Sequence, residues 1–308
     1  NLTAPAVPIA MQRGKTFLSI FSTGLNEEFQ YDRYFSMIPN GPDAKIAYTE
    51  GFFALAAAQD PAPKTVAIVA ADTEAAQLIA EGARINAEEV GLQIVYDRAY
   101  PPNTSDYTSI IQAVKATNPD VVLLSTGPVD GAGLVRATNE VGFKPGMIGG
   151  AMMGLPSPIM KAQLGPLLNG FMNTEFWLPQ ENMTTPASLE FIERYRERAA
   201  GQNVDQIGLY VPPWAYSYMQ VLEQAVEIAG SLDDDAIAAA MRDTTFQTVA
   251  GEVKFGADGE WAESRLLQVQ YEGIEGNEMG QFSDLSTVKI LWPEAYQTDE
   301  LTYPFNPE

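Results

Sequence analysis

Short apolar runs alternate with amphipathic segments between residues 65 and 141, and this alternation restricts the fold more than any other feature. The run TVAIVAAD (65–72) is apolar almost throughout and ends in a polar turn, as is typical of a strand buried on both faces. Glu74–Val90 follows with apolar side chains on one helical stripe, and Gly91 is placed to end a helix. Two more strand-like runs come next, LQIVY (92–96) and VVLL (121–124). The alternation predicts a parallel sheet covered by helices on both faces.

Sheets of this kind bind small molecules beyond the carboxyl ends of their strands. The pattern therefore predicts three candidate site loops, at Ala70–Ala75, Ser125–Asp130 and Gly149–Gly154. Gly149–Gly154 is glycine-dense but lacks the Lys and Ser/Thr of a phosphate-binding loop. Two interpretations stay open for it, a tight strand-to-helix turn and a ligand contact made by the backbone.

The flanking sequence predicts further elements of both kinds. Before the central region we expect a helix at Ala4–Arg13, strands at Thr16–Ser19 and Tyr34–Ile38, a helix at Asp43–Gln59 and a linker at Asp60–Pro63. After it we expect helices at Ser157–Leu164, Ala187–Ala200, Ala215–Ala229 and Ala236–Arg242, with a strand near Gly170–Trp177. From Thr248 onward the pattern becomes β: EVKF and EW flank the turn Gly256–Gly259 as a hairpin, and LLQVQY (266–271) and TVKILW (287–292) complete it.

Composition excludes several classes of function. The chain of 308 residues has 18 Lys and Arg against 40 Asp and Glu, a formal charge of −22, which disfavours nucleic acid as a partner. It has no Cys and no His, so thiol nucleophiles, Ser-His-Asp triads and most zinc sites are absent. No apolar run is long enough to span a membrane.

Three aromatic residues lie where a ligand could be gripped. Phe21 follows a predicted strand, and Tyr210 and Trp214 flank a Pro-Pro pair at the start of a predicted helix. Each alone is more often a core residue than a site residue. Together they would suit a partly apolar ligand held by a few polar groups.

The order of motifs resembles a known family. The segments that carry the resemblance are APAVPIAMQRGKTFLSIFSTG, YFSMIPNGP, KTVAIVAAD, YPPNTSDYTSIIQAVKATNPDVVLL, LVRATNEVGFKP with IGGAMMG, and GEVKFGADGEW. In this series the chain resembles the type I periplasmic substrate-binding proteins of ABC importers, in the Leu/Ile/Val-binding and hydrophobic amino acid or amide group. The resemblance covers nearly the whole chain in order, although no single motif is diagnostic.

The resemblance implies an α/β fold of two Rossmann-like lobes, each a parallel sheet flanked by helices. Three hinge crossings would join the lobes, which close on the ligand. We expect residues 1–62 with 177–262 to form the first lobe, and 63–176 with 263–308 the second. The family begins with two or three further strands and helices, roughly 80–90 residues, so the resemblance implies a first lobe that is incomplete at its N-terminus.

The resemblance also places ligand contacts on this chain. In the first lobe they fall on Asn1, on the loop Phe21, Ser22 and Thr23, and on Tyr210; in the second they fall on Ala75, Gly127, Pro128 and Ala151. Met152, next to Ala151, offers adaptable apolar contact. The family has an aromatic residue where this chain has Ala75, and an acidic residue that grips the ligand ammonium where it has Ala151. Both departures count against an α-amino acid as the ligand.

The implied function is an extracytoplasmic solute-binding protein, periplasmic or lipid-anchored in a Gram-positive cell. It would capture a small organic acid, aromatic acid, amide or branched-chain-amino-acid-like compound and deliver it to an ABC importer permease. The alternative is a ligand-sensing module of the same fold. An enzyme is disfavoured because catalytic motifs are absent. We expect no cofactor, no catalytic residue, no metal and no nucleic-acid partner, and we expect a monomer.

Overall fold

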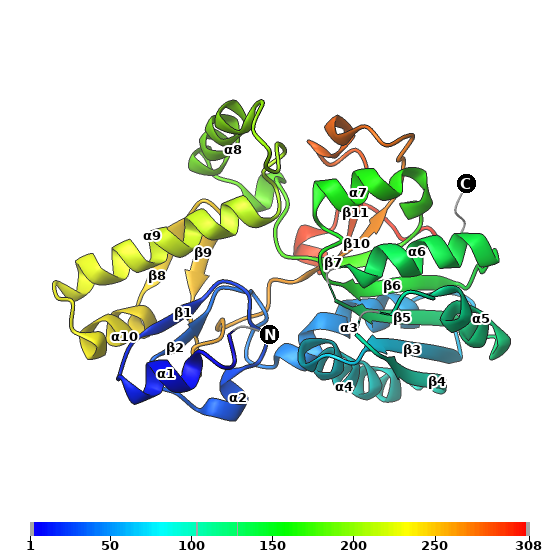
Figure 1. Cartoon of the computed structure of the whole chain (residues 1–308), viewed down its shortest axis with the longest axis horizontal. Coiled ribbons are helices and arrows are strands. Elements are labelled where there is room, and N and C mark those ends of the chain that lie inside the picture. Colours follow the sequence, from blue (N-terminus) through cyan, green and yellow to red (C-terminus); the bar gives the residue numbers. More distant parts are fainter. Residues whose placement is uncertain (1–2, 103, 128, 306–308) are drawn as a thin grey trace. The chain divides into compact units, whose positions relative to one another are not determined.

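The computed structural model describes residues 3–102, 104–127 and 129–305, and it divides the chain into two compact units (Figure 1). The first unit comprises Asn1–Ala44 and Phe176–Arg265, and the second comprises Lys45–Glu175 and Leu266–Glu308. The chain crosses from one unit to the other after Ala44, after Glu175 and after Arg265.

Within the described residues, the second unit is built on a seven-stranded sheet in the order β11-β10-β7-β6-β5-β3-β4. Its strands are β3 (Thr65–Ala71), β4 (Gln93–Tyr100), β5 (Val121–Thr126), β6 (Met147–Met152), β7 (Met172–Glu175), β10 (Leu267–Tyr271) and β11 (Val288–Trp292). Strands β3 to β7 pair in parallel, whereas β10 runs antiparallel to both β7 and β11. The predicted parallel sheet is therefore confirmed for the central strands.

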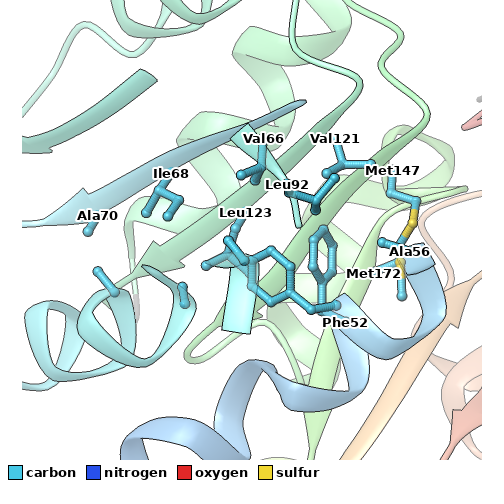
Figure 2. Close-up of a cluster of buried hydrophobic side chains, with 14 of the residues drawn as sticks. Phe52, Ala56, Val66, Ile68, Ala70, Leu92, Val121, Leu123, Met147 and Met172 are labelled. Atoms are coloured by element: carbon cyan, nitrogen blue, oxygen red, sulfur yellow. The ribbon is translucent and has the colours of Figure 1, made fainter. Parts of the chain in front are cut away.

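Helices flank this sheet, with α3 and α4 on one face and α5, α6 and α7 on the other (Figure 1). Their bounds are α3 (Ala44–Ala57), α4 (Glu74–Glu89), α5 (Thr108–Ala116), α6 (Asp130–Val141) and α7 (Pro158–Leu164), with short 3₁₀ turns at Gly165–Leu168, Met279–Phe282 and Glu294–Tyr296. Figure 2 shows the core under α3 and α4, where Phe52 lies against Leu123 and Met172. Full burial of a ring such as Phe52 stabilises the unit by about 1.5–3 kcal/mol.

Helix α3 belongs to the second unit, so its assignment to the first lobe was wrong. Its residues Phe52, Phe53 and Ala56 pack into the core of the second sheet. The backbones of α3 and α4 also approach closely, because a Cβ on Gly82 would lie 1.9 Å from the carbonyl oxygen of Lys45. Residues 60–63, the predicted linker, therefore lie between α3 and β3 inside the second unit.

The first unit contains a parallel pair of strands, β1 (Phe17–Ser19) and β2 (Tyr34–Ser36). Its helices are α1 (Val7–Gln12), α2 (Asn26–Phe29), α8 (Pro186–Ala199), α9 (Val211–Ala229) and α10 (Asp234–Asp243), with a 3₁₀ turn at Glu181–Met183. Local signals set the helix starts. The side chain of Thr185 closes a capping box with Ser188, and Asp233 accepts hydrogen bonds from the backbone of Asp235 and Ala236.

The predicted hairpin around the turn at 256–259 is present in short form: Phe255 and Trp261 form an antiparallel bridge, and the backbone of Ala262 donates to the carbonyl oxygen of Lys254 at 2.9 Å. The prediction missed the main partner of β9 (Gly251–Lys254), which is β8 (Thr245–Thr248). A tight turn at Gly251, with φ of +92°, brings β8 and β9 together. LLQVQY and TVKILW supply β10 and β11 of the second unit.

Candidate functional site

An aromatic group in the first unit collects several of the predicted site residues. Phe21 follows β1, and Tyr210 immediately precedes α9. Their rings stack with centroids 6.2 Å apart. Phe176 lies 6.3 Å from Phe21 and 6.4 Å from Trp214. Phe21 is 36% exposed and Tyr210 is half-buried, whereas Trp214 is 2% exposed. Phe21 and Tyr210 are thus the accessible edge of the group, and Trp214 is part of its buried base.

The buried base is held by Arg265. Its guanidinium carbon lies 4.7 Å from the ring centroid of Trp261 and 5.9 Å from that of Trp214. The same guanidinium donates to the carbonyl oxygen of Ala250 at 2.7 Å. Cation–π contacts of this kind fix a ring as well as stabilise it. The aromatic group therefore rests on a braced support.

The loop after β1 is held from inside the first unit. The hydroxyl of Ser22 hydrogen-bonds to the hydroxyl of Tyr34, and the hydroxyl of Ser36 donates to the carbonyl oxygen of Ser22 at 2.9 Å. Ser22 is buried, and burial raises the pKa of the Tyr34 phenol. Thr23 is half-buried. Ser22 is therefore arranged to position the loop, while Phe21 presents its ring beside it.

The second unit places its predicted site residues at the carboxyl ends of parallel strands. Ala75 lies half-buried in the first turn of α4, and Gly127 follows β5. Ala151 and Met152 lie in β6 and are buried. The register aligns Ala151 with Ser125 of β5, so these residues share one edge of the sheet. Asn1 and Pro128 lie outside the described residues.

The expectation of a loop at Gly149–Gly154 was wrong for its first four residues, because β6 extends to Met152; only Met153 and Gly154 lie in the turn that follows. Gly149 and Gly150 have φ angles of +120° and +105°, which other residues rarely adopt. A Cβ on Gly149 would lie 2.0 Å from the carbonyl oxygen of Met172 in β7. Gly149 therefore allows two strands to approach, and the tight-turn interpretation holds only for Gly154, which lies in the turn between β6 and α7.

Asp130, at the start of α6, is a buried carboxylate that fixes the strand ends around Gly127. It accepts hydrogen bonds from the hydroxyls of Tyr107 at 2.9 Å and Tyr100 at 3.2 Å. Burial, and then the hydrogen bond to Asp130, raise the pKa of Tyr107 to about 12. A Cβ on Gly127 would lie 2.9 Å from a carboxylate oxygen of Asp130. The end of β4, the start of α5 and the start of α6 are therefore tied together.

A second buried network in this unit was not anticipated. Lys161 of α7 forms an ion pair with Glu175 at 3.0 Å, and the hydroxyl of Tyr271 donates to the same carboxylate at 2.9 Å. Asn173 accepts a hydrogen bond from the backbone of Met152 at 2.7 Å. The position of Glu175 between apolar residues, Phe171-Met172 before it and Phe176-Trp177 after it, was the signal that could have flagged it, since charges are rarely buried unless paired.

The described residues carry no group of three His, Cys, Asp or Glu side chains arranged to hold a metal ion. Within the same ranges, no helix is both long enough and apolar enough to cross a bilayer.

Comparisons with known proteins agree with this architecture. The family model described as periplasmic binding protein matches residues 1–276. The chain is 26% identical over 220 residues to Leu/Ile/Val-binding protein homolog 8 of Brucella abortus, covering 70% of this chain and 54% of that protein. Homolog 7 of the same organism is 28% identical over 135 residues, 43% of this chain and 34% of that protein. The chain thus spans about half the length of the first of these relatives.

Solved structures show the same fold at low identity. A leucine-binding protein of Thermotoga maritima superposes with a TM-score of 0.72 at 17% identity, covering 92% of this chain and 74% of that one. A solute-binding protein of Rhodopseudomonas palustris in complex with 3,4-dihydroxybenzoic acid gives 0.70 at 15% identity, covering 89% and 72%. A substrate-binding protein of Desulfitobacterium hafniense in complex with Leu gives 0.68 at 18% identity, covering 94% and 76%.

The mostly parallel sheet with flanking helices matches the type I periplasmic binding proteins. The family model covers most of the chain. This chain belongs to the periplasmic binding protein family, whose members are extracytoplasmic binding proteins and not enzymes.

Proposed function

We propose that this chain captures a small organic ligand outside the cytoplasm and delivers it to the membrane permease of an ABC importer. The observation that carries the proposal is the stacked pair Phe21 and Tyr210, which keeps two rings accessible beside a strand end. Half-exposed aromatic rings that are already held in place can contact the apolar part of a ligand with little loss of side-chain entropy. The support below them, Trp214 with Arg265, keeps the rings in place.

We further propose that the ligand carries no ammonium group. The resemblance puts the ammonium-binding carboxylate at Ala151, and an ammonium left without a counter-charge on burial costs several kcal/mol. An organic acid, aromatic acid or amide has no ammonium group, so its binding is not weakened when residue 151 is an alanine. Among the structural neighbours, one was solved with Leu and another with 3,4-dihydroxybenzoic acid, so the fold accommodates both chemistries.

Titration calorimetry tests this proposal. The panel is 3,4-dihydroxybenzoate, benzoate, benzamide, 4-methyl-2-oxopentanoate and leucine, each titrated into the purified chain near neutral pH. We expect saturable binding of at least one of the first four, little or no binding of leucine, and recovery of the bound compound unchanged. Heats of dilution alone for the whole panel, or conversion of the bound compound to a product, would overturn the proposed function.

A further inference from the structure

Glu260 is a buried acid without a hydrogen-bond partner among the described residues. It lies in the first unit, in the turn after β9, and is 3% exposed. Neither of its carboxyl oxygens is in a hydrogen bond of normal geometry; the fully buried Asn40 beside it is the one polar side chain that favours the charged form, and its amide is likewise without a hydrogen bond of normal geometry. A carboxylate ion in such surroundings is costly, whereas a protonated carboxyl group is tolerated far better.

The charged groups that act on Glu260 are also acidic. Asp258 belongs to its own turn and Glu27 lies on α2, while the phenol of Tyr34 approaches it from β2. Burial, and then the charge of Asp258, raise the pKa of Glu260 to about 8, and Asn40 offsets only part of this effect.

Backbone contacts connect Glu260 to the loop after β1. The carbonyl oxygen of the preceding residue, Gly259, accepts a hydrogen bond from the backbone of Ser36 at 2.9 Å. A Cβ on Gly259 would lie 1.8 Å from the carbonyl oxygen of Tyr34, so turn and strand are in direct contact. Tyr34 and Ser36 are the two residues whose hydroxyls hold Ser22. The turn, β2 and the loop therefore form one continuous packed path.

We propose that Glu260 holds a proton in the folded first unit, and that this proton keeps the 256–261 turn against β2 and thereby the loop at residues 20–23 in position. When the proton is lost, the new buried charge forces the turn away from β2 and loosens the loop. Glu260 is a positioning residue in this account. Its consequence for ligand affinity rests on the proposed function, but the proton and the loop can be measured without ligand.

The proton is tested by urea unfolding of the wild type, Glu260→Gln and Glu263→Gln. Gln is neutral and nearly the same shape, and Glu263 is an exposed acid three residues away. The unfolded chain releases the Glu260 proton above its ordinary pKa of 4.5, whereas the folded unit keeps it to about 8, so stability falls as pH rises through this window. The unfolding constant of the wild type and of Glu263→Gln should rise by up to about tenfold per pH unit relative to Glu260→Gln. The same dependence of the unfolding constant on pH in all three proteins would overturn the proposal.

If Glu260→Gln fails to fold, infrared spectroscopy of the wild type alone decides the same point. A buried, protonated carboxyl band should be present near neutral pH and should vanish as pH rises through about 8. Absence of such a band in the folded protein contradicts the proposal.

The loop is tested by hydrogen exchange at matched pH. At about pH 9, amides of residues 20–23 should exchange at least about threefold faster in the wild type and Glu263→Gln than in Glu260→Gln, and at about pH 6 the three should agree. Equal exchange at both pH values overturns the link to the loop. Calorimetric titration with benzoate at the same two pH values extends the test to ligand affinity, and weaker binding at the higher pH supports the inference. No binding at either pH counts against the proposed function. In that case the hydrogen-exchange result still decides whether the inference about Glu260 holds.

Discussion

Phe21 differs from its aromatic neighbours in the exposure of its ring. Trp214 and Trp261 are buried under Arg265, and their contacts are explained by the packing of the first unit. Phe21 remains 36% exposed although Tyr210 and Phe176 are within stacking distance. A single exposed ring needs no explanation by itself, but this one is fixed at a strand end by an anchored loop. The proposed binding surface therefore depends on Phe21 more than on any other residue.

Truncation of this ring is the first prediction. Phe21→Ala should weaken the best ligand of the calorimetric panel at least about tenfold, since an aromatic contact of this kind contributes about 1.4 kcal/mol. Tyr216→Ala is the matched control, because Tyr216 is a half-exposed ring on α9 of the same unit whose partner is Phe191. An affinity of Phe21→Ala equal to that of Tyr216→Ala would remove Phe21 from the site.

The second prediction concerns Ala151 as the position that selects against ammonium groups. Ala151→Glu places a carboxylate at a buried strand end, so it should weaken an acidic ligand more than tenfold, above about 1.4 kcal/mol. Ala151→Gln adds the same bulk without charge and isolates the electrostatic part. Thermal unfolding of both variants controls for damage to β6. Equal affinities in the two variants, or tight leucine binding by the wild type, would show that Ala151 is merely a small residue in a strand.

Among the elements, β6 contains a glycine pair, Gly149 and Gly150, that the sequence pattern placed in a loop. Gly149→Ala should destabilise the protein by about 3 kcal/mol or more, because it adds a strained backbone and a clash with the β7 carbonyl. Gly276→Ala is the control, since a Cβ there meets nothing within 4 Å. Urea unfolding measures both. A Gly149→Ala protein as stable as Gly276→Ala would mean that β6 and β7 do not approach as described.

The elements that could be predicted are those whose signal is local. The periodicity of the central region correctly gave β3, α4 and β5, because a strand buried on both faces and an amphipathic helix each have a distinct pattern. β4 was predicted too short, since the apolar run stops at the charged and exposed residues Asp97 and Arg98. β8 was missed because four residues with two exposed side chains leave almost no pattern.

Contacts between distant residues could not be predicted in this way. Nothing near residue 50 indicates that α3 packs on the second sheet, because the buried cluster that contains Phe52 extends along the chain to Leu291. The pairing of Lys161 with Glu175 and the position of Phe176 depend equally on tertiary structure. Among the candidate site residues, Phe21 and Tyr210 came together as expected, whereas the roles of Ala75, Gly127, Ala151 and Met152 stay predictions.

At the scale of the whole molecule, the chain forms two units joined by three crossings. Two crossings start from residues that are anchored within their own unit. Glu175 is held by Lys161 and Tyr271, and Arg265 donates to Ala250 while it covers Trp261. Charged groups held at several points leave little freedom to the backbone that carries them. Each of these crossings therefore begins at a fixed position.

The central claim is that this chain holds a small organic ligand and does no chemistry on it. Equilibrium unfolding in urea, without and with the best ligand of the panel at about 100 times its Kd, tests that claim most directly. A ligand that binds only the folded chain should raise the free energy of unfolding by about 2.7 kcal/mol. The compound should be recovered intact afterwards. An unchanged free energy of unfolding with every compound of the panel would contradict the claim.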